Sequence, residues 1–499
     1  MVDGSGSTRL VVVSNRLPVA LKQVDGEWRL TPGSGGLVSA MAPVLRNRGG
    51  TWIGWNGAAD GDDTREVLAA FSRNAGYDLR AVSLSLEEID GYYHGFSNET
   101  VWPLFHDMLG LASYAPENWR TYLEVNHKFA LEVAQAGGES DYIWVHDYHL
   151  MHVAWVLRQM GIKRKTGFFL HIPFPSPDIL LKLPWRTKVI QALLAYDLVG
   201  FQTTRDRRNF TKCVQLFHPQ AKARGRGAVV SLTVGDRSLR AGSFPIGIDY
   251  TAYAGTAAQP GVVARAAELR RTLDDRIIFL GVDRLDYTKG IPQRFEALRT
   301  ALTTYPELLG AVSLIQVAVP SREEVGAYKA LKEEIERLVG DINGRFSRPG
   351  YIPIHYMYRS LGKEELCAYY RAADVALVTP LRDGMNLVAK EYVACNHSRT
   401  GVLLLSEFAG AAAQLQNGAI LVNPHDVEGV AKSIRRACRL PEDARRMYMR
   451  KMQDTVRRTD IFGWVDSFLH AAFSRSLDDF PALASEGVDY SLYGVSPGV

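Results

Sequence analysis

Residues Arg276–Pro292 have the sequence RIIFLGVDRLDYTKGIP. The apolar run Arg276–Val282 predicts a strand buried on both faces, and charged residues follow it directly. Pro292 is favoured in the first turn of a helix. The spacing of one helical face is shared by Ile291, Phe295, Leu298 and Leu302. A buried strand followed by an amphipathic helix is the repeating unit of a parallel α/β sheet.

The same alternation recurs along the chain in two series. Further buried strands are predicted at Arg9–Ser14, Asp141–Val145, Thr166–His171, Leu198–Gln202, Ser313–Val319, Ile352–Met357, Asp374–Thr379 and Gly401–Ser406. The sequence therefore predicts an α/β protein with two Rossmann-like, doubly wound domains. The change between the two series is expected near Ser243–Tyr250, where Pro and Gly interrupt any helical period.

The expected domain boundaries follow from these two series. They are a disordered leader at 1–8, an N-terminal domain at 9–245, a C-terminal domain at 246–459, a helix at 460–478 that packs back on the N-terminal domain, and a flexible tail at 479–499. The stretch Gln220–Arg240 is rich in Lys, Arg and Gly, and is expected to form an exposed hairpin or loop.

Composition excludes several classes of protein. The 499 residues carry 58 Lys and Arg against 54 Asp and Glu, a balance that argues against a dedicated nucleic-acid-binding protein. The four cysteines lie far apart with no CxxC pair, which indicates reduced thiols and excludes a cysteine-based zinc site. With no run of 18 apolar residues and a polar N-terminus, we expect a cytoplasmic protein without a membrane partner. We separately expect a homo-oligomer.

Ligands of open α/β sheets bind at the carboxyl ends of the strands, so the residues there are the candidate site. Arg284 and Lys289 follow the strand at 276–282, beside a helix N-terminus, and suit a diphosphate, although two solvated loop charges remain an alternative. The GSGG run at 33–36 can bring backbone N–H groups to a phosphate or a sugar at a helix start, and a flexible connector is the alternative. Neither a GxGxxG turn after the first strand nor a P-loop is present.

Asp383–Asn386 follows another predicted strand and precedes a short helix that contains Glu391. An ionised carboxylate accepts hydrogen bonds on both oxygens, so Glu391 suits the two hydroxyls of a ribose. A helix-start Asp and a surface Glu are the plainer alternative. Arg322 is a third cation at a strand end.

The first half contains a histidine-rich strand end at His146–His152. His146, His149 and His152 would diverge on a helix, so no metal site is expected. Asp147 is the better functional candidate, and His171 ends the next strand. Tyr92–Asn98 and Trp102 form a segment that we expect to be rich in turns, and its aromatic side chains suit a carbohydrate or a packed loop.

Ten segments together are similar to the trehalose-6-phosphate synthase family of retaining glycosyltransferases. In chain order they are SNRLP, SGGL, YYHGFSN, HDYHL, FFLHIPFP, FPIGID, DRLDYTKG, PSRE, TPLRDGMNLVAKEY and SEFAGAA. The resemblance extends from about Arg9 to Phe473. It implies the GT-B architecture, in which two Rossmann-like domains face a central cleft, with the donor on the C-terminal domain and the acceptor mainly on the N-terminal one.

The resemblance also implies a role for each candidate residue. Donor binding is expected at Gly36, Arg284, Lys289, Asp383, Gly384, Met385, Asn386, Leu387, Val388 and Glu391. Acceptor binding is expected at Arg16, Trp55, Tyr93, Trp102, Asp147 and Arg322, where Arg16, Tyr93 and Arg322 match the site of the acceptor phosphate. Catalysis is expected to involve Asp147, His171, Arg284 and Lys289, with His171 near the reacting sugar.

The implied reaction transfers glucose from UDP-glucose to glucose-6-phosphate, giving α,α-trehalose 6-phosphate with retention and without a metal or other cofactor. ADP-glucose and GDP-glucose remain alternative donors, because no residue that we can identify contacts the base. Other retaining GT-B transferases, such as a glycogen-synthase-like enzyme, and a silent sugar-phosphate sensor are the alternative functions. A phosphorylase with pyridoxal phosphate on Lys390 is the least favoured, since Lys390 lies inside a matched donor motif.

Overall fold

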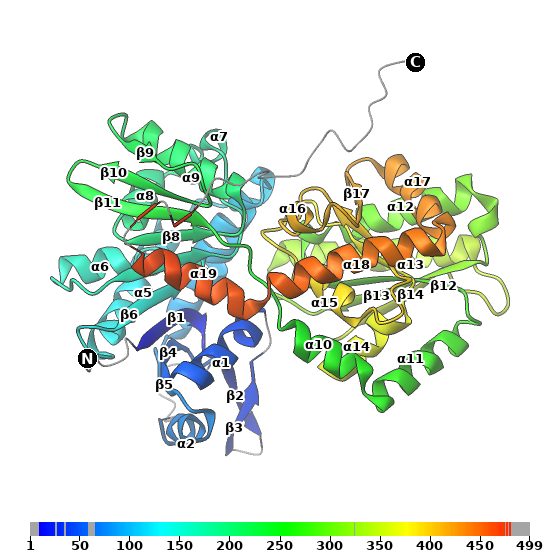
Figure 1. Ribbon diagram of the computed structural model, residues 1–499, viewed down its shortest axis with the longest axis horizontal. Helices are drawn as coiled ribbons and strands as arrows, with labels where there is room; N and C mark the ends of the chain where they lie inside the picture. Colours follow the sequence, from blue (N-terminus) through cyan, green and yellow to red (C-terminus); the bar gives the residue numbers. More distant parts are fainter. Residues whose placement is uncertain are drawn as a thin grey trace. The chain divides into compact units, whose positions relative to one another are not determined.

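The computed structural model describes residues 9–24, 27–33, 36–57, 65–323, 325–474, 476–477 and 479–480. These residues divide into two compact units (Figure 1). The first unit contains the described residues up to Phe244 and those from Trp464 onward, and the second contains Pro245–Gly463. The expected leader at 1–8, and all of the expected tail except Asp479 and Phe480, lie outside the described residues.

The first unit is built on a nine-stranded sheet, counted over the described residues. In spatial order the strands are β5 (Asp78–Ala81), β4 (Gly50–Trp55), β1 (Leu10–Arg16), β6 (Tyr142–His146), β7 (Thr166–Leu170), β8 (Leu198–Phe201), β11 (Arg237–Ser243), β10 (Val229–Val234) and β9 (Lys222–Arg224). The strands from β5 to β11 are parallel, and β10 is antiparallel to both of its neighbours. Strands β2 (Val19–Val24) and β3 (Glu27–Pro32) form a separate hairpin.

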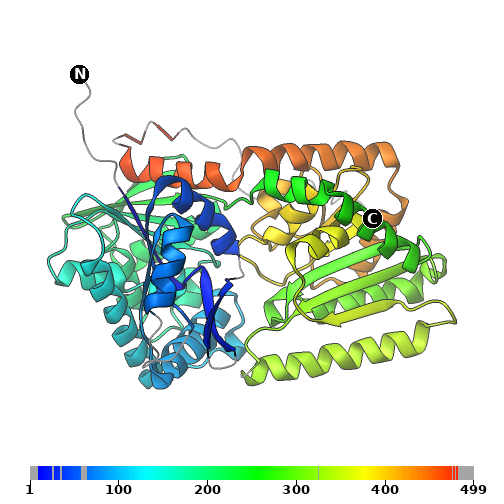
Figure 2. The same ribbon diagram turned by 90° about the horizontal axis from the view of Figure 1, so that it is seen from below.

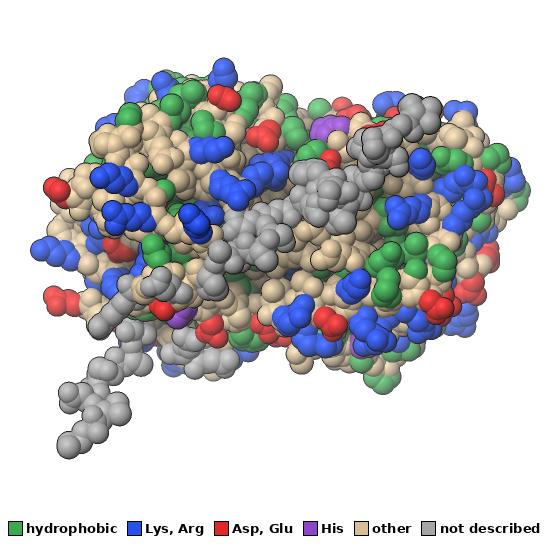
Figure 3. All heavy atoms as spheres, turned by 45° about the horizontal axis from the view of Figure 1, so that its top comes forward, with side chains coloured by type: hydrophobic (Ala, Val, Ile, Leu, Met, Phe, Trp, Pro, Cys, Tyr) green, Lys and Arg blue, Asp and Glu red, His purple; other side chains and the backbone are tan. Residues whose placement is uncertain are grey.

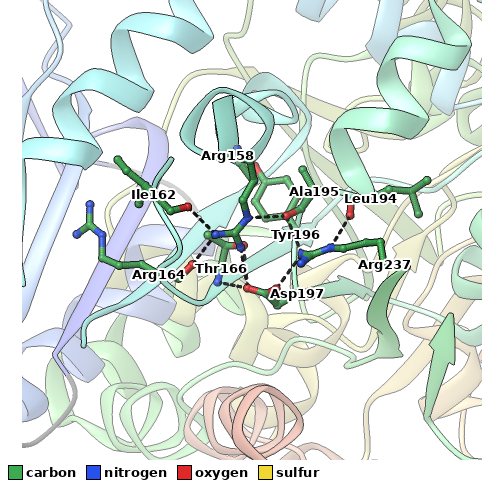
Figure 4. Close-up of polar contacts among 10 residues, drawn as sticks. Arg158, Ile162, Arg164, Thr166, Leu194, Ala195, Tyr196, Asp197 and Arg237 are labelled. Atoms are coloured by element: carbon green, nitrogen blue, oxygen red, sulfur yellow. Dashed lines mark hydrogen bonds and ion pairs between the residues drawn. The ribbon is translucent and has the colours of Figure 1, made fainter. Parts of the chain in front are cut away.

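Of the two alternatives expected for the basic stretch at 220–240, the hairpin is present: β10 and β11 pair antiparallel, and β9 adds the edge strand of this sheet. Lys222, Ala223 and Arg224 of the edge strand β9 are all exposed, and charged residues on an edge strand disfavour pairing with another chain. The guanidinium of Arg237 donates to Asp197 Oδ1 at 2.8 Å, and that of Arg158 donates to Asp197 Oδ2 at 2.9 Å (Figure 4). Asp197 directly precedes β8, and Arg237 is the first residue of β11. The contact between them therefore links the amino ends of these two neighbouring strands.

The helix α19 (Ile461–Phe473) packs on the first-unit sheet through its aromatic residues. The Phe468 ring stacks on Trp144 of β6 at 4.2 Å between centroids. A Cβ added to Gly167 or Gly200 would lie 2.9 or 2.7 Å from a Phe468 ring carbon, so these glycines make room for the helix.

The other α-helices of this unit are α1 (Gly36–Arg48), α2 (Arg65–Ala75), α3 (Leu86–Glu88), α4 (Trp102–Phe105), α5 (Pro116–Gln135), α6 (Val153–Gln159), α7 (Pro177–Leu180), α8 (Arg186–Leu193) and α9 (Thr204–Phe217).

The second unit has a six-stranded sheet in the described residues, parallel throughout. Its spatial order is β14 (Ile354–Tyr358), β13 (Val312–Val319), β12 (Ile277–Arg284), β15 (Val375–Val378), β16 (Val402–Ser406) and β17 (Ile420–Val422). On one face α12 (Ile291–Thr304), α13 (Gly326–Phe346) and α17 (Val427–Arg439) bury their apolar residues in one core. Figure 2 shows α13 as the long yellow-green helix that runs along the sheet. The predicted α12 face is confirmed, because all four of its residues are buried.

The remaining second-unit helices are α10 (Tyr250–Ala258), α11 (Pro260–Thr272), α14 (Lys363–Ala372), α15 (Leu387–Cys395), α16 (Ala412–Leu415) and α18 (Glu442–Arg458). All nine strands predicted from the sequence are present, with ends that differ by at most two residues. The α/β class with two parallel-sheet units is therefore confirmed.

No helix among the described residues is long and apolar enough to cross a bilayer. Lys and Arg side chains are interspersed with Asp and Glu on the face shown in Figure 3.

Candidate active site

In the first unit, Arg16 lies on aromatic rings at the carboxyl end of the sheet. It ends β1, pairs in register with Trp55 at the end of β4, and its guanidinium carbon lies 3.7 Å from the centroid of the Trp55 ring. The Tyr93 ring is 5.7 Å away. A Cβ on Gly57, whose φ is +93°, would lie 2.8 Å from Arg16 Nη1, so this position needs glycine. The contacts are cation–π interactions, which fix the cation in place.

The segment with Tyr93 and Trp102 was expected to be rich in turns, and that expectation is wrong. Residues Ile89–Val101 form a π-helix, η1, which continues into α4. Gly91 and Gly95 are required by helix packing, since a Cβ on Gly95 would lie 2.3 Å from the Asn118 side chain of α5. The glycines that resemble turn residues in the sequence therefore allow two helices to approach closely. π-helical turns are frequent at functional sites.

The aromatic residues of η1 and its neighbours form a continuous array. Tyr93 stacks on His149 at 5.8 Å, His149 lies 3.9 Å from Tyr148, and Tyr148 lies 5.8 Å from Trp102, all between ring centroids. The array thus joins the predicted residues Tyr93 and Trp102 through two residues that the sequence did not assign to the acceptor site. The SNRLP motif is attached to the same region, because Tyr92 donates to Asn15 Oδ1 at 2.9 Å.

Asp147 follows β6 with φ +74° and ψ 166°, a region of backbone conformation that is almost restricted to glycine. Its N–H donates to Phe169 O at 2.8 Å, and its Oδ1 accepts the N–H of His171 at 3.2 Å. Such a conformation costs about 1–3 kcal/mol and tends to occur at active sites. The strain therefore supports a functional role for Asp147, which the sequence proposed from its position alone.

His171 has a polar partner at each ring nitrogen. Its Nε2 lies 3.1 Å from His146 Nδ1, and its Nδ1 lies 3.4 Å from Gln202 Nε2. Burial lowers the pKa of His171 to about 3, so the ring is neutral at neutral pH. His146 and Gln202 were not predicted as site residues, although both directly follow or end a strand beside that of His171.

The three histidines considered for a metal have separate surroundings. His146 contacts His171, His149 stacks on Tyr93, and His152 packs edge-on against Trp119 at 5.2 Å. Burial lowers the pKa of His152 to about 4. Within the described part of the chain, no three His, Cys, Asp or Glu side chains come together as a group that could bind a metal.

In the second unit, Lys289 and Asp383 form an ion pair of 2.6 Å, and both side chains are nearly buried. Asn386 Nδ2 donates to the same carboxylate oxygen at 3.1 Å. Lys289 is followed by Gly290, whose φ is +63° and whose added Cβ would lie 2.5 Å from Thr379 O. The sequence predicted donor contacts for both Lys289 and Asp383, but it did not predict that they bind each other.

A second carboxylate, Asp286, lies among the cations at the end of β12. It lies 3.9 Å from Arg284 and 3.7 Å from Arg322, and it accepts the N–H of Thr288 at 3.0 Å. Burial alone would raise the pKa of Asp286, but the charges of Arg322, Arg284 and Lys289 outweigh it and lower the pKa to about 2. Asp286 therefore stays ionised and keeps three cations close together at neutral pH.

Arg322, predicted beside Arg16 and Tyr93, belongs to the second unit, whereas Arg16 and Tyr93 belong to the first. Its guanidinium donates to the Tyr328 hydroxyl at 2.5 Å, and Tyr328 donates to Asp286 Oδ2 at 3.1 Å. Arg322 has a positive φ of 49°.

The segment Asp383–Asn386 is supported by the later segment Phe408–Ala411. Gly410 N donates to Asp383 O at 3.1 Å, and Ala411 N donates to Met385 O at 2.8 Å. A Cβ on Gly410 would lie 1.9 Å from Gly384 O, so the two backbones can approach only through a glycine. Asn386 then caps α15 by accepting the Ala389 N–H, and Leu387 and Val388 begin that helix.

Glu391 lies in the second turn of α15 and accepts two tyrosine hydroxyls. Tyr253 donates to Oε1 at 3.0 Å and Tyr370 to Oε2 at 2.8 Å. Lys390, its neighbour, is completely buried and donates to Ile246 O at 2.6 Å, which disfavours a Schiff base with pyridoxal phosphate. Gly36 begins α1, and Ser34 and Gly35 lie outside the described residues.

A model of glycosyltransferase family 20 matches residues 8–473. The chain belongs to this family. It is 44% identical to the trehalose-6-phosphate synthase of Mycolicibacterium smegmatis, over 94% of this chain and 93% of that protein. It is also 44% identical to the trehalose-6-phosphate synthase of Mycobacterium tuberculosis, over 93% of this chain and 95% of that protein.

Solved structures agree with this membership of family 20. The crystal structure of an α,α-trehalose-phosphate synthase (UDP-forming) from Burkholderia xenovorans in complex with glucose-6-phosphate has a TM-score of 0.85 and 35% identity, covering 93% of this chain and 100% of that one. A structure from Escherichia coli, described as trehalose-6-phosphate bound with UDP-2-fluoro glucose, has a TM-score of 0.84 and 36% identity. The match covers 93% of this chain and 99% of that one. This family 20 chain is thus a glycosyltransferase with the GT-B fold.

Proposed function

We propose that this chain transfers glucose from UDP-glucose to glucose-6-phosphate and forms α,α-trehalose 6-phosphate and UDP. The observation that carries the proposal is that three cations expected for donor and acceptor, Arg16, Arg284 and Lys289, lie where a strand or short helix of this family 20 chain ends. The neighbour from Burkholderia xenovorans has glucose-6-phosphate bound, and the one from Escherichia coli has UDP-2-fluoro glucose bound.

On the donor side, Arg284 and Lys289 would bind the diphosphate, together with the backbone N–H groups of Leu387 and Val388 at the start of α15. A diphosphate competes with Asp383 for Lys289, whose ion pair of 2.6 Å must open or be shared. The carboxylate of Asp383 and the backbone of Gly384–Asn386 would then bind glucose hydroxyls. Gly36 would lie against the diphosphate.

On the acceptor side, Arg16 and Tyr93 would bind the phosphate of glucose-6-phosphate. A role of Arg322 at that phosphate stays a prediction from the family resemblance. Several charge-assisted contacts are what a dianion requires. Trp55 and Trp102 would contact the sugar ring, because aromatic faces suit the C–H groups of a pyranose. Asp147 would accept hydrogen bonds from the acceptor hydroxyls.

Retention of configuration through two displacements would require a carboxylate nucleophile beneath the donor carbon. We propose instead that the acceptor attacks from the side on which the diphosphate leaves, and that a leaving oxygen of the diphosphate takes the acceptor proton. Arg284 and Lys289 stabilise the negative charge that develops there, in the role that a metal has in other glycosyltransferases. Asp147 positions the acceptor, and His171, neutral because its pKa is about 3, serves near the sugar as a hydrogen-bonding group.

The test is the release of nucleoside diphosphate from UDP-, ADP- and GDP-glucose, each with and without glucose-6-phosphate, in the presence of EDTA. Release that requires glucose-6-phosphate and persists in EDTA supports the proposal and ranks the donors. Release with another acceptor only indicates a different retaining GT-B transferase. No release with any donor indicates a sugar-phosphate sensor and contradicts the proposal.

A homo-oligomeric state, a cytoplasmic location and the absence of a nucleic-acid partner stay predictions from the sequence. Gel filtration with light scattering tests the first of these directly.

A further inference from the structure

Glu391 has an unusual pair of partners, one on each carboxylate oxygen. Tyr253 comes from α10 and Tyr370 from α14, so three helices of the second unit meet at this carboxylate. Tyr370 is 1% exposed, and Glu391 remains partly exposed. The two hydroxyls therefore contact the carboxylate from within the unit while part of it still faces outward.

The direction of both hydrogen bonds is fixed. Burial raises the pKa of Tyr370 and of Tyr253, so both hydroxyls keep their protons and donate. Burial raises the pKa of Glu391, while the hydrogen bonds from Tyr370 and Tyr253 and the charge of Lys363 act in the opposite direction. The tyrosines thus favour the ionised carboxylate, the form that accepts on both oxygens.

The other polar groups of this cluster are few among the described residues. Lys363 Nζ lies 4.7 Å from the centroid of the Tyr253 ring. Cys395, one turn after Glu391, has its Sγ 3.7 Å from that of Cys367, one turn before Tyr370. Glu364 lies in the first turn of α14, next to Lys363. A purely structural junction between three helices could use an uncharged glutamine, which avoids the cost of desolvating a carboxylate.

We propose that Tyr253 and Tyr370 are positioning residues for nucleotide recognition: they fix the Glu391 carboxylate so that its outward lone pairs accept the 2′- and 3′-hydroxyls of the donor ribose. This inference rests on the proposed function, in which Glu391 contacts the ribose. Each carboxylate oxygen has two acceptor sites, and each tyrosine uses one, so one per oxygen remains for a ribose hydroxyl. The two tyrosines order the carboxylate before the nucleotide arrives, which lowers the entropy lost on binding.

The experiment compares Tyr370→Phe and Tyr253→Phe with wild type on two ligands, UDP and 2′,3′-dideoxy-UDP, by titration calorimetry of the full chain. Tyr392→Phe is the matched control, because this buried tyrosine neighbours Glu391 on α15 but donates to Asp374 O at 3.2 Å. We expect each test variant to bind UDP about 10-fold more weakly, because a carboxylate that is no longer held in place loses the value of about one ribose hydrogen bond. Binding of the dideoxy nucleotide should be unchanged in all variants.

A second readout is the pH dependence of UDP affinity. Removal of a tyrosine hydroxyl raises the pKa of Glu391, so the acid limb of the affinity profile moves to higher pH in Tyr370→Phe and stays in place in Tyr392→Phe. Equal weakening for both nucleotides, with no movement of the acid limb, would show a structural junction and overturn the inference.

Turnover with UDP-glucose and glucose-6-phosphate keeps the two proposals apart. If wild type binds UDP with the expected ribose dependence but shows no turnover, the proposed function fails and the positioning role stands. If turnover is normal and the tyrosine variants show no ribose dependence, only the positioning role fails. Absence of UDP binding by the folded wild-type chain overturns both.

Discussion

The two units hold their site cations in different ways. In the first unit Arg16 lies on the rings of Trp55 and Tyr93, whereas in the second unit Lys289 is paired with Asp383. A cation on aromatic faces is fixed in position without a carboxylate that an anion must displace. A cation paired with a carboxylate must exchange partners when an anion binds, and the released carboxylate becomes an acceptor for sugar hydroxyls. The first arrangement suits a phosphate that is only bound, and the second suits a phosphate that leaves.

The largest effect should come from Lys289→Ala in the second unit. The variant removes a charge that we place at the leaving diphosphate and leaves Asp383 without its ion pair, so kcat/KM for UDP-glucose should fall about 10³-fold. Initial rates of UDP release measure it. Lys332→Ala, which removes a partly exposed lysine paired with Glu336 on α13, is the control and should retain wild-type rates. A fall of less than 10-fold for Lys289→Ala would refute the leaving-group role.

Arg16→Ala tests the cation of the first unit, where we expect the variant to weaken binding of the acceptor and not that of the donor. Loss of one charge-assisted phosphate contact should raise KM for glucose-6-phosphate about 10²-fold and leave KM for UDP-glucose nearly unchanged. Unphosphorylated glucose at high concentration serves as the control acceptor, because its slow turnover should be the same in the variant and in wild type. An equal loss with glucose would mean that Arg16 supports the fold of the site and does not bind the phosphate.

The pH dependence of the unfolding free energy tests how much Asp286, a buried carboxylate of the second unit, stabilises the fold. Its pKa in the folded chain is about 2, below the ordinary 3.8, so its contribution is complete above pH 5 and is lost as the pH falls through 2. The loss should amount to about 2 kcal/mol of unfolding free energy. Urea denaturation at pH 5, 4 and 3 measures the trend, and in Asp286→Asn the trend should be shallower by the contribution of this one carboxylate. Asp274→Asn, at an exposed ion pair with Arg276, should keep the wild-type trend.

The smallest expected effect concerns the strained backbone of Asp147 in the first unit. Asp147→Gly and Asp147→Ala lose the same side-chain contacts, but only glycine adopts φ +74° with ψ 166° without strain. The glycine variant should therefore be about 1–2 kcal/mol more stable than the alanine variant in urea denaturation. Both should lose acceptor-dependent activity, and the wild type should form no glycosyl-aspartate detectable by mass spectrometry. Equal stability of the two variants would mean that Asp147 is not strained.

The sequence predicted the elements well where the pattern was local. The strands are continuous apolar runs, and α12 has a clear helical period, so neither depends on distant contacts. The sequence was wrong about Ile89–Val101, because Gly91 and Gly95 have the composition of a turn. Their role is visible only with α5 beside them, where they admit Asn118 and Thr121. It also missed β4, whose residues GTWIGW include two glycines that weaken the strand pattern.

The candidate site shows the same division. Strand ends indicated Arg16, Asp147, His171, Arg284, Lys289 and Asp383, because in parallel sheets the carboxyl ends of the strands lie at one edge. Partners that come from distant segments could not be predicted. Tyr253 and Tyr370 meet Glu391 across 138 and 21 residues, and His146 and Gln202 meet His171 across 25 and 31.

By itself, the sequence determined the α/β class, the two parallel sheets, the family and the positions of the charged residues, because these depend on local periodicity and on motifs. Only the tertiary structure decided that Lys289 pairs with Asp383, that the backbone of Asp147 is strained and that the ring of His171 is neutral. The four cysteines, far apart in the sequence, illustrate the difference: Cys367 and Cys395 lie with their sulfur atoms 3.7 Å apart. Pairing, burial and strain arise from groups that the fold brings together, and the spacing of residues along the chain contains no record of them.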